Sequence, residues 1–213
     1  MIFARVSPPD FDLYLITDRL QTRGRNLLWV LERALDGGVR AVQLREKDLG
    51  GKELFQLAEK ARALCQRYGA RLFINDRVDI ALALDAAGVQ LGRASIPIQA
   101  ARALLGPQKL VGYSAHGLEE ARAAQETGAD FLLFGPVYFT PSKAAYGSPQ
   151  GIEALKKTVE NIALPVYAIG GISRDNIGAV RRTGARGVAL ISSIIGAEDP
   201  KKSAASLLEA LRG

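Results

Sequence analysis

The chain has 213 residues, of which 48% are hydrophobic, and carries a formal net charge of +6. This length buries a sizeable core without disulfides, and the single cysteine, Cys65, lacks a partner for an internal bridge. No stretch approaches the ~18 apolar residues of a membrane helix, so we expect one cytoplasmic domain over 1–213. The basic residues are interleaved with acids and lack stacking aromatics, which argues against nucleic acid as a partner.

Short apolar or β-branched runs alternate with helix-like stretches along the whole chain. The sequence predicts strands at 13–17, 40–44, 71–74, 88–91, 110–113, 130–134, 165–169 and 187–191. It predicts helices at 26–36, 51–68, 78–85, 97–105, 117–127, 151–160, 175–183 and 200–211. The strands are apolar almost throughout, which indicates parallel strands buried on both faces.

Eight strands, each followed by a helix, predict an α/β fold of the (β/α)8 TIM-barrel type. An open doubly wound sheet is the alternative, and it would carry a glycine-rich fingerprint after its first strand. The sequence there is TDRLQTRGR, without that fingerprint, so the barrel is favoured. A barrel builds its site from the loops that follow the strands, so the residues directly after each strand are the candidates for function.

Gln43, Arg45 and Lys47 alternate at the end of the second predicted strand. Period two would put them on one face, where two cations need an anionic partner. Phosphate or diphosphate suits them, with Arg as a fork and Lys as a point charge. The alternative is a structural ion pair with one of the nearby acids, Glu46, Asp48 or Glu53.

The loop after the sixth strand, 135–151, is long for its position and contains Thr140, Ser142 and Lys143. Two hydroxyls and a lysine suit phosphate oxygens, and the length suits a lid that closes over a ligand. A solvated loop without a ligand is the alternative.

Two further loops carry small residues at phosphate-binding positions. Gly170 and Gly171 follow the seventh strand, and ISS, which includes Ser192, follows the eighth. In many barrels these two loops bind a phosphate through backbone N–H groups.

His116 is the only histidine and follows the fifth strand at a helix start. It is a candidate proton shuttle, or a capping and packing residue. Asn75 and Asp76 end the third strand just before a helical pattern, where they could cap the helix or face a ligand. The sequence shows no zinc-ligand spacing and no nucleophilic triad.

Seven segments, in order along the chain, resemble one known family. They read LYLITD, VQLREKDL, FINDRVDIALA, VGYSAHGLEEA, GADFLLFGPVYFTPSK, AIGGIS and ALISSI. The chain is similar to thiamine-phosphate synthases and to their relatives, the TenI-type thiazole tautomerases. The resemblance implies a βα barrel that joins hydroxymethylpyrimidine diphosphate to thiazole phosphate, releasing diphosphate. It leaves the oligomeric state open, with a homodimer as one candidate.

The resemblance also implies roles for individual residues. Gln43, Arg45, Lys47, Asn75 and Lys143 would hold the diphosphate, and Ser114 would contact the pyrimidine. Asp76 would be a ligand of Mg²⁺ on the diphosphate. The thiazole phosphate would lie against Thr140, Pro141, Ser142, Gly170, Gly171, Ile191 and Ser192.

One position departs from the synthase pattern. The loop after the fourth strand usually supplies a second acidic metal ligand, but here it reads GRAS and places Ser95 there, with Arg93 nearby. A hydroxyl is a poorer Mg²⁺ ligand than a carboxylate. This loss favours the alternatives: a tautomerase that uses His116 as general acid and base, or a binding relative without turnover.

Overall fold

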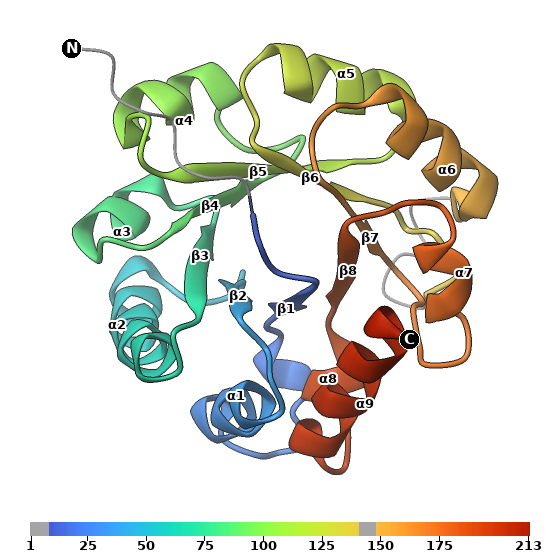
Figure 1. Cartoon of the computed structure of the whole chain (residues 1–213). Helices are drawn as coiled ribbons and strands as arrows, with labels where there is room; N and C mark the ends of the chain where they lie inside the picture. The colour runs from blue at the N-terminus through green and yellow to red at the C-terminus, as the bar shows by residue number, and fades with distance from the viewer. Residues whose placement is uncertain (1–8, 141–147) are drawn as a thin grey trace.

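The computed structural model describes residues 9–140 and 148–213, in which eight strands close into a parallel barrel. The strands are β1 (Leu13–Ile16), β2 (Ala41–Leu44), β3 (Arg71–Asn75), β4 (Gly88–Leu91), β5 (Leu110–Ala115), β6 (Phe131–Phe134), β7 (Val166–Ile169) and β8 (Gly187–Leu190). They follow one another in chain order, and β8 pairs with β1. Figure 1 shows this ring with the helices around its outside. The predicted (β/α)8 fold is confirmed.

The helices match the predicted pattern closely. They are α1 (Leu27–Asp36), α2 (Gly51–Arg67), α3 (Val78–Ala83), α4 (Ile98–Leu105), α5 (Leu118–Glu126), α6 (Gly151–Asn161), α7 (Ile177–Arg181), α8 (Ser192–Ile195) and α9 (Pro200–Arg212). A 3₁₀ helix, η1 (Arg19–Gln21), precedes α1. Neither η1 nor α8 was predicted, because segments this short show no helical periodicity.

The predicted helix 175–183 is too long at both ends, since α7 is shorter. The side chain of Asn176 explains the late start. Its Oδ1 accepts the N–H of Ser173 at 2.9 Å, and its Nδ2 donates to the carbonyl of Gly171 at 2.9 Å. Asn176 therefore shapes the turn before α7 instead of lying inside the helix.

Two helix starts show local sequence deciding local structure. Asn26 precedes α1, and its Oδ1 accepts the backbone N–H groups of Leu28 at 2.9 Å and Trp29 at 3.3 Å. Asp199 does the same for α9, where Pro200 occupies the first turn. Both side chains satisfy donors that have no partner within the helix.

The inside of the barrel is filled with aromatic rings over its N-terminal half. Phe11 enters below the strands and stacks on Tyr167, with ring centroids 4.9 Å apart. Tyr14, Phe73 and Phe131 surround it at centroid distances of 5.4–6.0 Å. These five rings are almost completely buried. They form a floor that closes this end of the barrel to a ligand.

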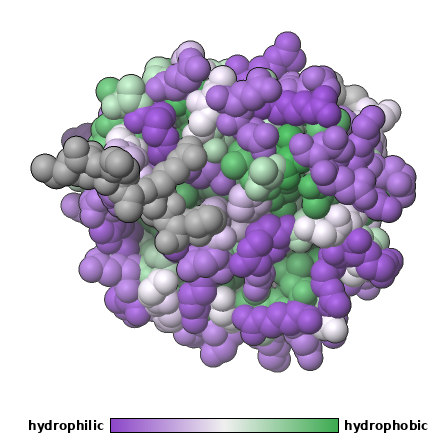
Figure 2. Space-filling view, turned by 45° about the horizontal axis from the view of Figure 1, so that its top comes forward, coloured by the Kyte–Doolittle hydropathy of each residue, from purple (hydrophilic) through white to green (hydrophobic). Residues whose placement is uncertain are grey.

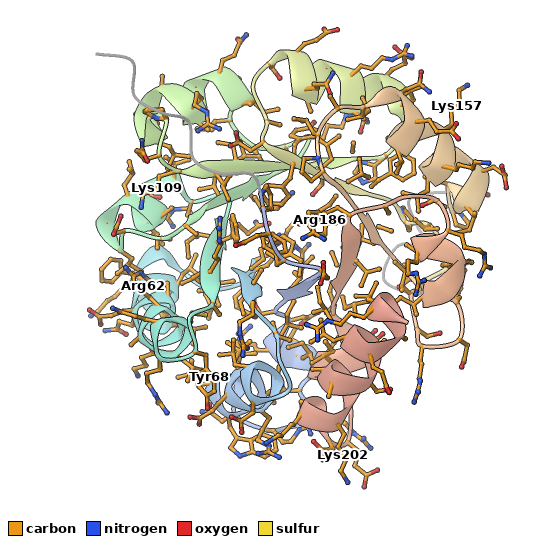
Figure 3. The ribbon with its side chains drawn as sticks, viewed as in Figure 1. Arg62, Tyr68, Lys109, Lys157, Arg186 and Lys202 are labelled. Carbon is orange, nitrogen blue, oxygen red and sulfur yellow. The ribbon has the colours of Figure 1, made fainter. Side chains whose placement is uncertain are left out.

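Charged pairs seal the outer side of this floor. Asp12 pairs with Arg186, which lies near the middle of the ring in Figure 3, and Asp10 pairs with Arg71 at 3.0 Å. The hydroxyl of Tyr167 donates to the carbonyl of Phe11 at 2.8 Å, and burial raises the pKa of this tyrosine. Any site inside the barrel therefore opens at the C-terminal ends of the strands.

The surface is largely hydrophilic. In the view of Figure 2, purple side chains cover most of the face, with green ones in smaller areas between them. Within residues 9–140 and 148–213, no helix is long and apolar enough to cross a membrane. Cys65 on α2 is 1% exposed, and burial raises the pKa of its thiol to about 12. The cysteine is therefore a packing residue.

Candidate active site

The barrel interior is polar near the C-terminal ends of the strands, whereas its N-terminal half is aromatic. Gln43 on β2, Asn75 on β3, Gln90 on β4 and Ser114 on β5 lie near the C-terminal ends of four neighbouring strands. The backbone register places Asn75 beside Gln90. The barrel interior thus changes along its axis from rings to amides and hydroxyls, and these four side chains make up a polar cluster at the mouth.

Gln43 is the most buried residue of this polar cluster. It is 1% exposed, and its Nε2 donates to the hydroxyl of Tyr14 at 3.4 Å, which ties it to the aromatic floor. Tyr14 itself is buried, and desolvation raises its pKa. Gln43 therefore joins the polar cluster to the aromatic floor.

The period-two argument for Arg45 and Lys47 is wrong, because β2 ends at Leu44. Beyond it the backbone turns: the N–H of Arg45 donates to the hydroxyl of Thr17 at 2.9 Å, and the N–H of Leu49 donates to the carbonyl of Glu46 at 3.4 Å. The two cations reach the mouth from a loop instead of a strand.

The structural ion pair considered for these cations does not form among the described residues. Glu46 and Asp48 both contact Arg19 of η1, whose Nη1 lies 3.7 Å from Glu46 and 2.6 Å from Asp48. Arg45 and Lys47 have no acidic partner in the described part of the chain. Residues 1–8 and 141–147 contain no Asp or Glu. Two positive charges at the mouth are thus left for an anion from solution.

Asn75, Asp76 and Ser95 meet between β3 and β4. Asp76 accepts a hydrogen bond from the Asn75 amide at 2.7 Å on Oδ2 and one from the Ser95 hydroxyl on Oδ1. The Ser95 hydroxyl in turn accepts the N–H of Gly92 at 2.7 Å. Asp76 is exposed and has a φ of +60°, held by its N–H bond to the Gln90 carbonyl at 3.0 Å.

Neither Asn75 nor Asp76 caps α3 with its side chain. The residue before α3 is Arg77, which makes no side-chain cap and instead pairs with Asp79. The capping alternative for the Asn75–Asp76 pair is therefore wrong. The Asp76 carboxylate instead accepts a hydrogen bond from the Ser95 hydroxyl, in the loop after the neighbouring strand β4.

A metal held by protein side chains alone does not fit this pair. Asp76 is a single carboxylate, Ser95 is neutral, and the described residues include no group of three His, Cys, Asp or Glu that could hold a metal ion. Mg²⁺ is, however, commonly held by one or two carboxylates together with substrate phosphates. Asp76 suits this shared mode and no other.

Gln90 was not predicted as a site residue. It is 2% exposed, its Nε2 donates to Ser114 Oγ at 3.1 Å, and its buried Oε1 has no hydrogen-bond partner in the described part of the chain. Gly112 makes room for it, since a Cβ there would lie 2.3 Å from that oxygen. Gln90 therefore orients Ser114 and keeps an acceptor free beside it.

His116 follows β5 directly, at the mouth. Its Nδ1 lies 3.3 Å from Glu120 Oε2, and the same oxygen accepts the His116 backbone N–H at 2.8 Å. The imidazole is 42% exposed. Glu120 holds the ring from one side, and Nε2 has no hydrogen-bond partner among the described residues.

The loop after β6 is described only in part. Thr140 is described and has an interaction of its own, whereas Pro141, Ser142 and Lys143 lie outside the described residues. Just before it, Phe139 is 67% exposed. The predicted roles of Pro141, Ser142 and Lys143 stay predictions.

Gly170 and Gly171 have a packing reason to be glycine. Their φ values are +97° and +65°, and a Cβ would lie 2.6 Å from Pro136 Cβ at the first position and 2.5 Å from the Phe139 carbonyl oxygen at the second. Close approach of the 136–139 segment therefore accounts for both glycines, whether or not a phosphate binds.

The two serines after β8 differ. Ser193 Oγ donates to the Ile172 carbonyl at 2.8 Å and ties the loop after β7 to α8. Ser192 is exposed and begins α8, directly after Ile191. In the described part of the chain, the backbone N–H groups of Gly171 and Ser192 have no acceptor. These two donors are available to a ligand.

Sequence reasoning therefore missed several residues that shape the mouth. They are Thr17, Arg19, Gln90 and Asn176. The only sequence feature that pointed to Arg19 was its position soon after the first strand. A sequence does not show with which acid an arginine will form an ion pair.

Comparisons with known proteins agree with this architecture. A family profile described as "TMP-TENI: Thiamine monophosphate synthase" matches residues 13–194. A Geobacter sulfurreducens protein named "Putative thiamine-phosphate synthase" is 57% identical over 202 residues, covering 95% of each chain. The "Thiamine-phosphate synthase" of Syntrophomonas wolfei is 44% identical over 198 residues, covering 93% of this chain and 95% of its own.

Among solved structures, the "Thiamine phosphate pyrophosphorylase from Pyrococcus furiosus" superposes with a TM-score of 0.86 at 41% identity, over 94% of this chain and 95% of that one. A 3-hexulose-6-phosphate synthase with a TM-score of 0.66 at 20% identity shares the fold alone. The profile match and the two relatives together show that this chain belongs to the thiamine monophosphate synthase (TMP-TENI) family.

Proposed function

We propose that the protein joins hydroxymethylpyrimidine diphosphate to thiazole phosphate, giving thiamine phosphate and diphosphate in thiamine biosynthesis. The observation that carries the proposal is the identity of 57% and 44%, over nearly the full length, to relatives named as thiamine-phosphate synthases. The two cations left without acidic partners at the mouth support it independently, because the reaction releases a polyanion.

The protein's main chemical task is to stabilise the leaving diphosphate. The bond from the pyrimidine methylene carbon to oxygen breaks, and the thiazole nitrogen takes its place on that carbon. Negative charge develops on the departing diphosphate, where Arg45 and Lys47 stabilise it by charge and hydrogen bonds. Lys143 acts in the same way in this proposal. No protein nucleophile takes part.

The polar cluster at the mouth orients the pyrimidine in this proposal. Ser114, held by Gln90 at 3.1 Å, is the proposed contact for the ring, and Gln43 lies below it at the floor. Asn75, whose amide donates to the Asp76 carboxylate, would contact the diphosphate. The buried Gln90 Oε1, without a partner in the described part of the chain, offers an acceptor for an amino group.

The thiazole phosphate binds across the loops after β7 and β8 in this proposal. Gly171 and Ser192 would donate their backbone N–H groups, with Gly170 and Ile191 beside them. Thr140, Pro141 and Ser142 would complete the site from the loop after β6.

Asp76 is the residue that would hold Mg²⁺, together with substrate phosphate oxygens. A bound Mg²⁺ would neutralise charge on the leaving diphosphate. Ser95 gives the ion no second carboxylate, so we propose that the ion enters with the diphosphate. A cytoplasmic location and a homodimer are further parts of the proposal that rest on sequence alone.

The test is the coupling reaction. Purified protein, Mg²⁺ and the two phosphorylated substrates should give thiamine phosphate, followed by chromatography. Arg45→Gln and Lys47→Gln should each lower kcat/KM by about 10²-fold, on the scale found for lost transition-state donors. Lys52→Gln, which removes an exposed charge from the start of α2, is the matched control and should stay within about twofold.

Assays on the same purified protein distinguish the synthase from the two alternative functions. A tautomerase would isomerise the thiazole carboxylate phosphate and lose this activity in His116→Ala. A binding relative would retain thiazole phosphate in calorimetry while both assays read zero. Absence of thiamine phosphate in the coupling assay would refute the synthase.

A further inference from the structure

Arg19 contacts both acids of the charged segment that follows β2. The segment after β2 reads Arg45-Glu46-Lys47-Asp48, so cations and anions alternate. Neighbouring opposite charges in a short loop would ordinarily neutralise one another. The structure separates them, because both acids contact η1 instead.

Four contacts make this separation. Arg19 Nη1 donates to both carboxylate oxygens of Asp48, at 2.6 and 2.7 Å. The Arg19 backbone N–H donates to Glu46 Oε2 at 3.1 Å, and Nη1 lies 3.7 Å from the same oxygen. One arginine thus engages both acids of the segment.

The contact with Arg19 also favours the charged form of Asp48. The hydrogen bond from Arg19 lowers the pKa of the Asp48 carboxyl, and the same contact raises the pKa of Arg19. Asp48 is therefore a carboxylate at neutral pH with its charge directed to η1. It is also 51% exposed at the side chain, so without Arg19 it has room to turn.

Glu46 adds a second reason for the arrangement. Its side chain is 2% exposed, and its Oε1 has no hydrogen-bond partner among the described residues. A buried carboxylate without a nearby cation is costly. If Arg19 were lost, the nearest cations in sequence would be Arg45 and Lys47.

The backbone of the two loops is joined at the same place. Thr17, buried at the end of β1, accepts the N–H of Arg45 at 2.9 Å, and its own N–H donates to the Gln43 carbonyl at 2.9 Å. The contact between η1 and the 45–48 segment is therefore a built feature of the β1–β2 edge.

We infer that Arg19 is a positioning residue for the diphosphate site: it holds Asp48 and Glu46 away from Arg45 and Lys47, so that both cations stay available to the anion. The inference rests on the proposed function, since it assigns the diphosphate to these cations. Arg19 need not touch the substrate. It acts by occupying the two competing carboxylates.

The test is calorimetric titration with inorganic pyrophosphate at low salt. Arg19→Gln should weaken binding on the order of tenfold, because one charge-assisted interaction of the anion is lost to Asp48. Arg23→Gln is the matched control: it removes the same charge from the same loop, and Arg23 is exposed without a described ion pair. It should change the affinity less than about twofold.

The double variant Arg19→Gln/Asp48→Asn separates positioning from direct contact. With the competing carboxylate removed, pyrophosphate affinity should return to within about threefold of the wild type, whereas Asp48→Asn alone should change little. Arg19→Lys should rescue binding in part, because lysine brings the charge without the fork. In steady state, the KM for the pyrimidine diphosphate should rise while that for thiazole phosphate stays unchanged.

The outcomes are distinguishable. If Arg19→Gln binds pyrophosphate as Arg23→Gln does, or if the double variant stays as weak as Arg19→Gln, the inference is overturned. Should the wild type neither bind pyrophosphate nor form product, the proposed function fails first. Thermal unfolding of each variant shows whether it is folded. If Arg19→Gln does not fold, the comparison of Arg19→Lys with the wild type still tests the inference.

Discussion

Replacing Ser95 by aspartate is expected to make the stability of the protein depend on Mg²⁺. In the wild type the Ser95 hydroxyl donates to Asp76 and accepts the backbone N–H of Gly92 at 2.7 Å. The Ser95–Asp76 pair therefore carries a single negative charge, on Asp76. Ser95→Asp would place a second carboxylate against the first. Like charges in contact repel, and a divalent cation between them removes the repulsion.

The magnitude follows from the exposure of the pair. Asp76 is exposed, so two charges about 4 Å apart cost about 1 kcal/mol at the dielectric of water. The lost hydrogen bond from the Ser95 hydroxyl adds about 1 kcal/mol. Together they should lower Tm by about 4–8 °C in a chain of this length, measured in EDTA.

Adding MgCl₂ without substrate should reverse this loss. At a concentration of 100 times Kd, binding to the folded state contributes about 2.7 kcal/mol, which more than offsets the repulsion. Circular dichroism melts in EDTA and in rising MgCl₂ measure both arms. The wild type should show no such response, and Ser95→Asn, which matches aspartate in size without its charge, should respond like the wild type.

A Ser95→Asp variant whose Tm is the same in EDTA and in MgCl₂ would refute the reasoning. So would an equal Mg²⁺ response of Ser95→Asn, because the effect would then not arise from the carboxylate pair. Either result would mean that Ser95 and Asp76 do not form the two sides of one cation position.

Three further predictions concern the frame of the barrel. Phe11→Ala opens the floor beneath Tyr167, and the free energy of unfolding in urea should fall by about 3–5 kcal/mol; a loss below about 1 kcal/mol would show that the floor collapses around the gap. Gly171→Ala should lower stability by about 1–3 kcal/mol, because φ is +65° and the new Cβ meets the Phe139 carbonyl, and an unchanged Tm would contradict this. Cys65, with its pKa raised to about 12 by burial, has almost no thiolate at pH 8, so a thiol reagent should label it only after unfolding in urea; rapid labelling of the native protein would be the contrary result.

Much of the fold follows from the sequence because it depends on local patterns. Apolar runs of four or five residues separated by helical periodicity predicted every strand of the barrel. The position of the mouth followed too, since the loops after parallel strands meet at one end. The shortest elements, η1 and α8, were not predicted, because a segment of four residues or fewer is too short to show helical periodicity.

The candidate site depended on contacts that no local pattern contains. The sequence predicted that Arg45 and Lys47 face an anion, but it assumed a strand that in fact ends at Leu44. It also left open the alternative of an ion pair with Glu46, Asp48 or Glu53. Arg19 instead contacts both Glu46 and Asp48, because β1 and β2 are neighbours in the closed barrel.

The same holds for Asp76. Asn75 beside it is evident from the chain, but the hydroxyl of Ser95 reaches it only because β3 and β4 pair in register. By itself, then, the sequence determined the barrel, the end that carries the site and the residue types gathered there. Only the tertiary structure decided which charges neutralise one another and which stay free, because ion pairs depend on distances between segments far apart in the chain.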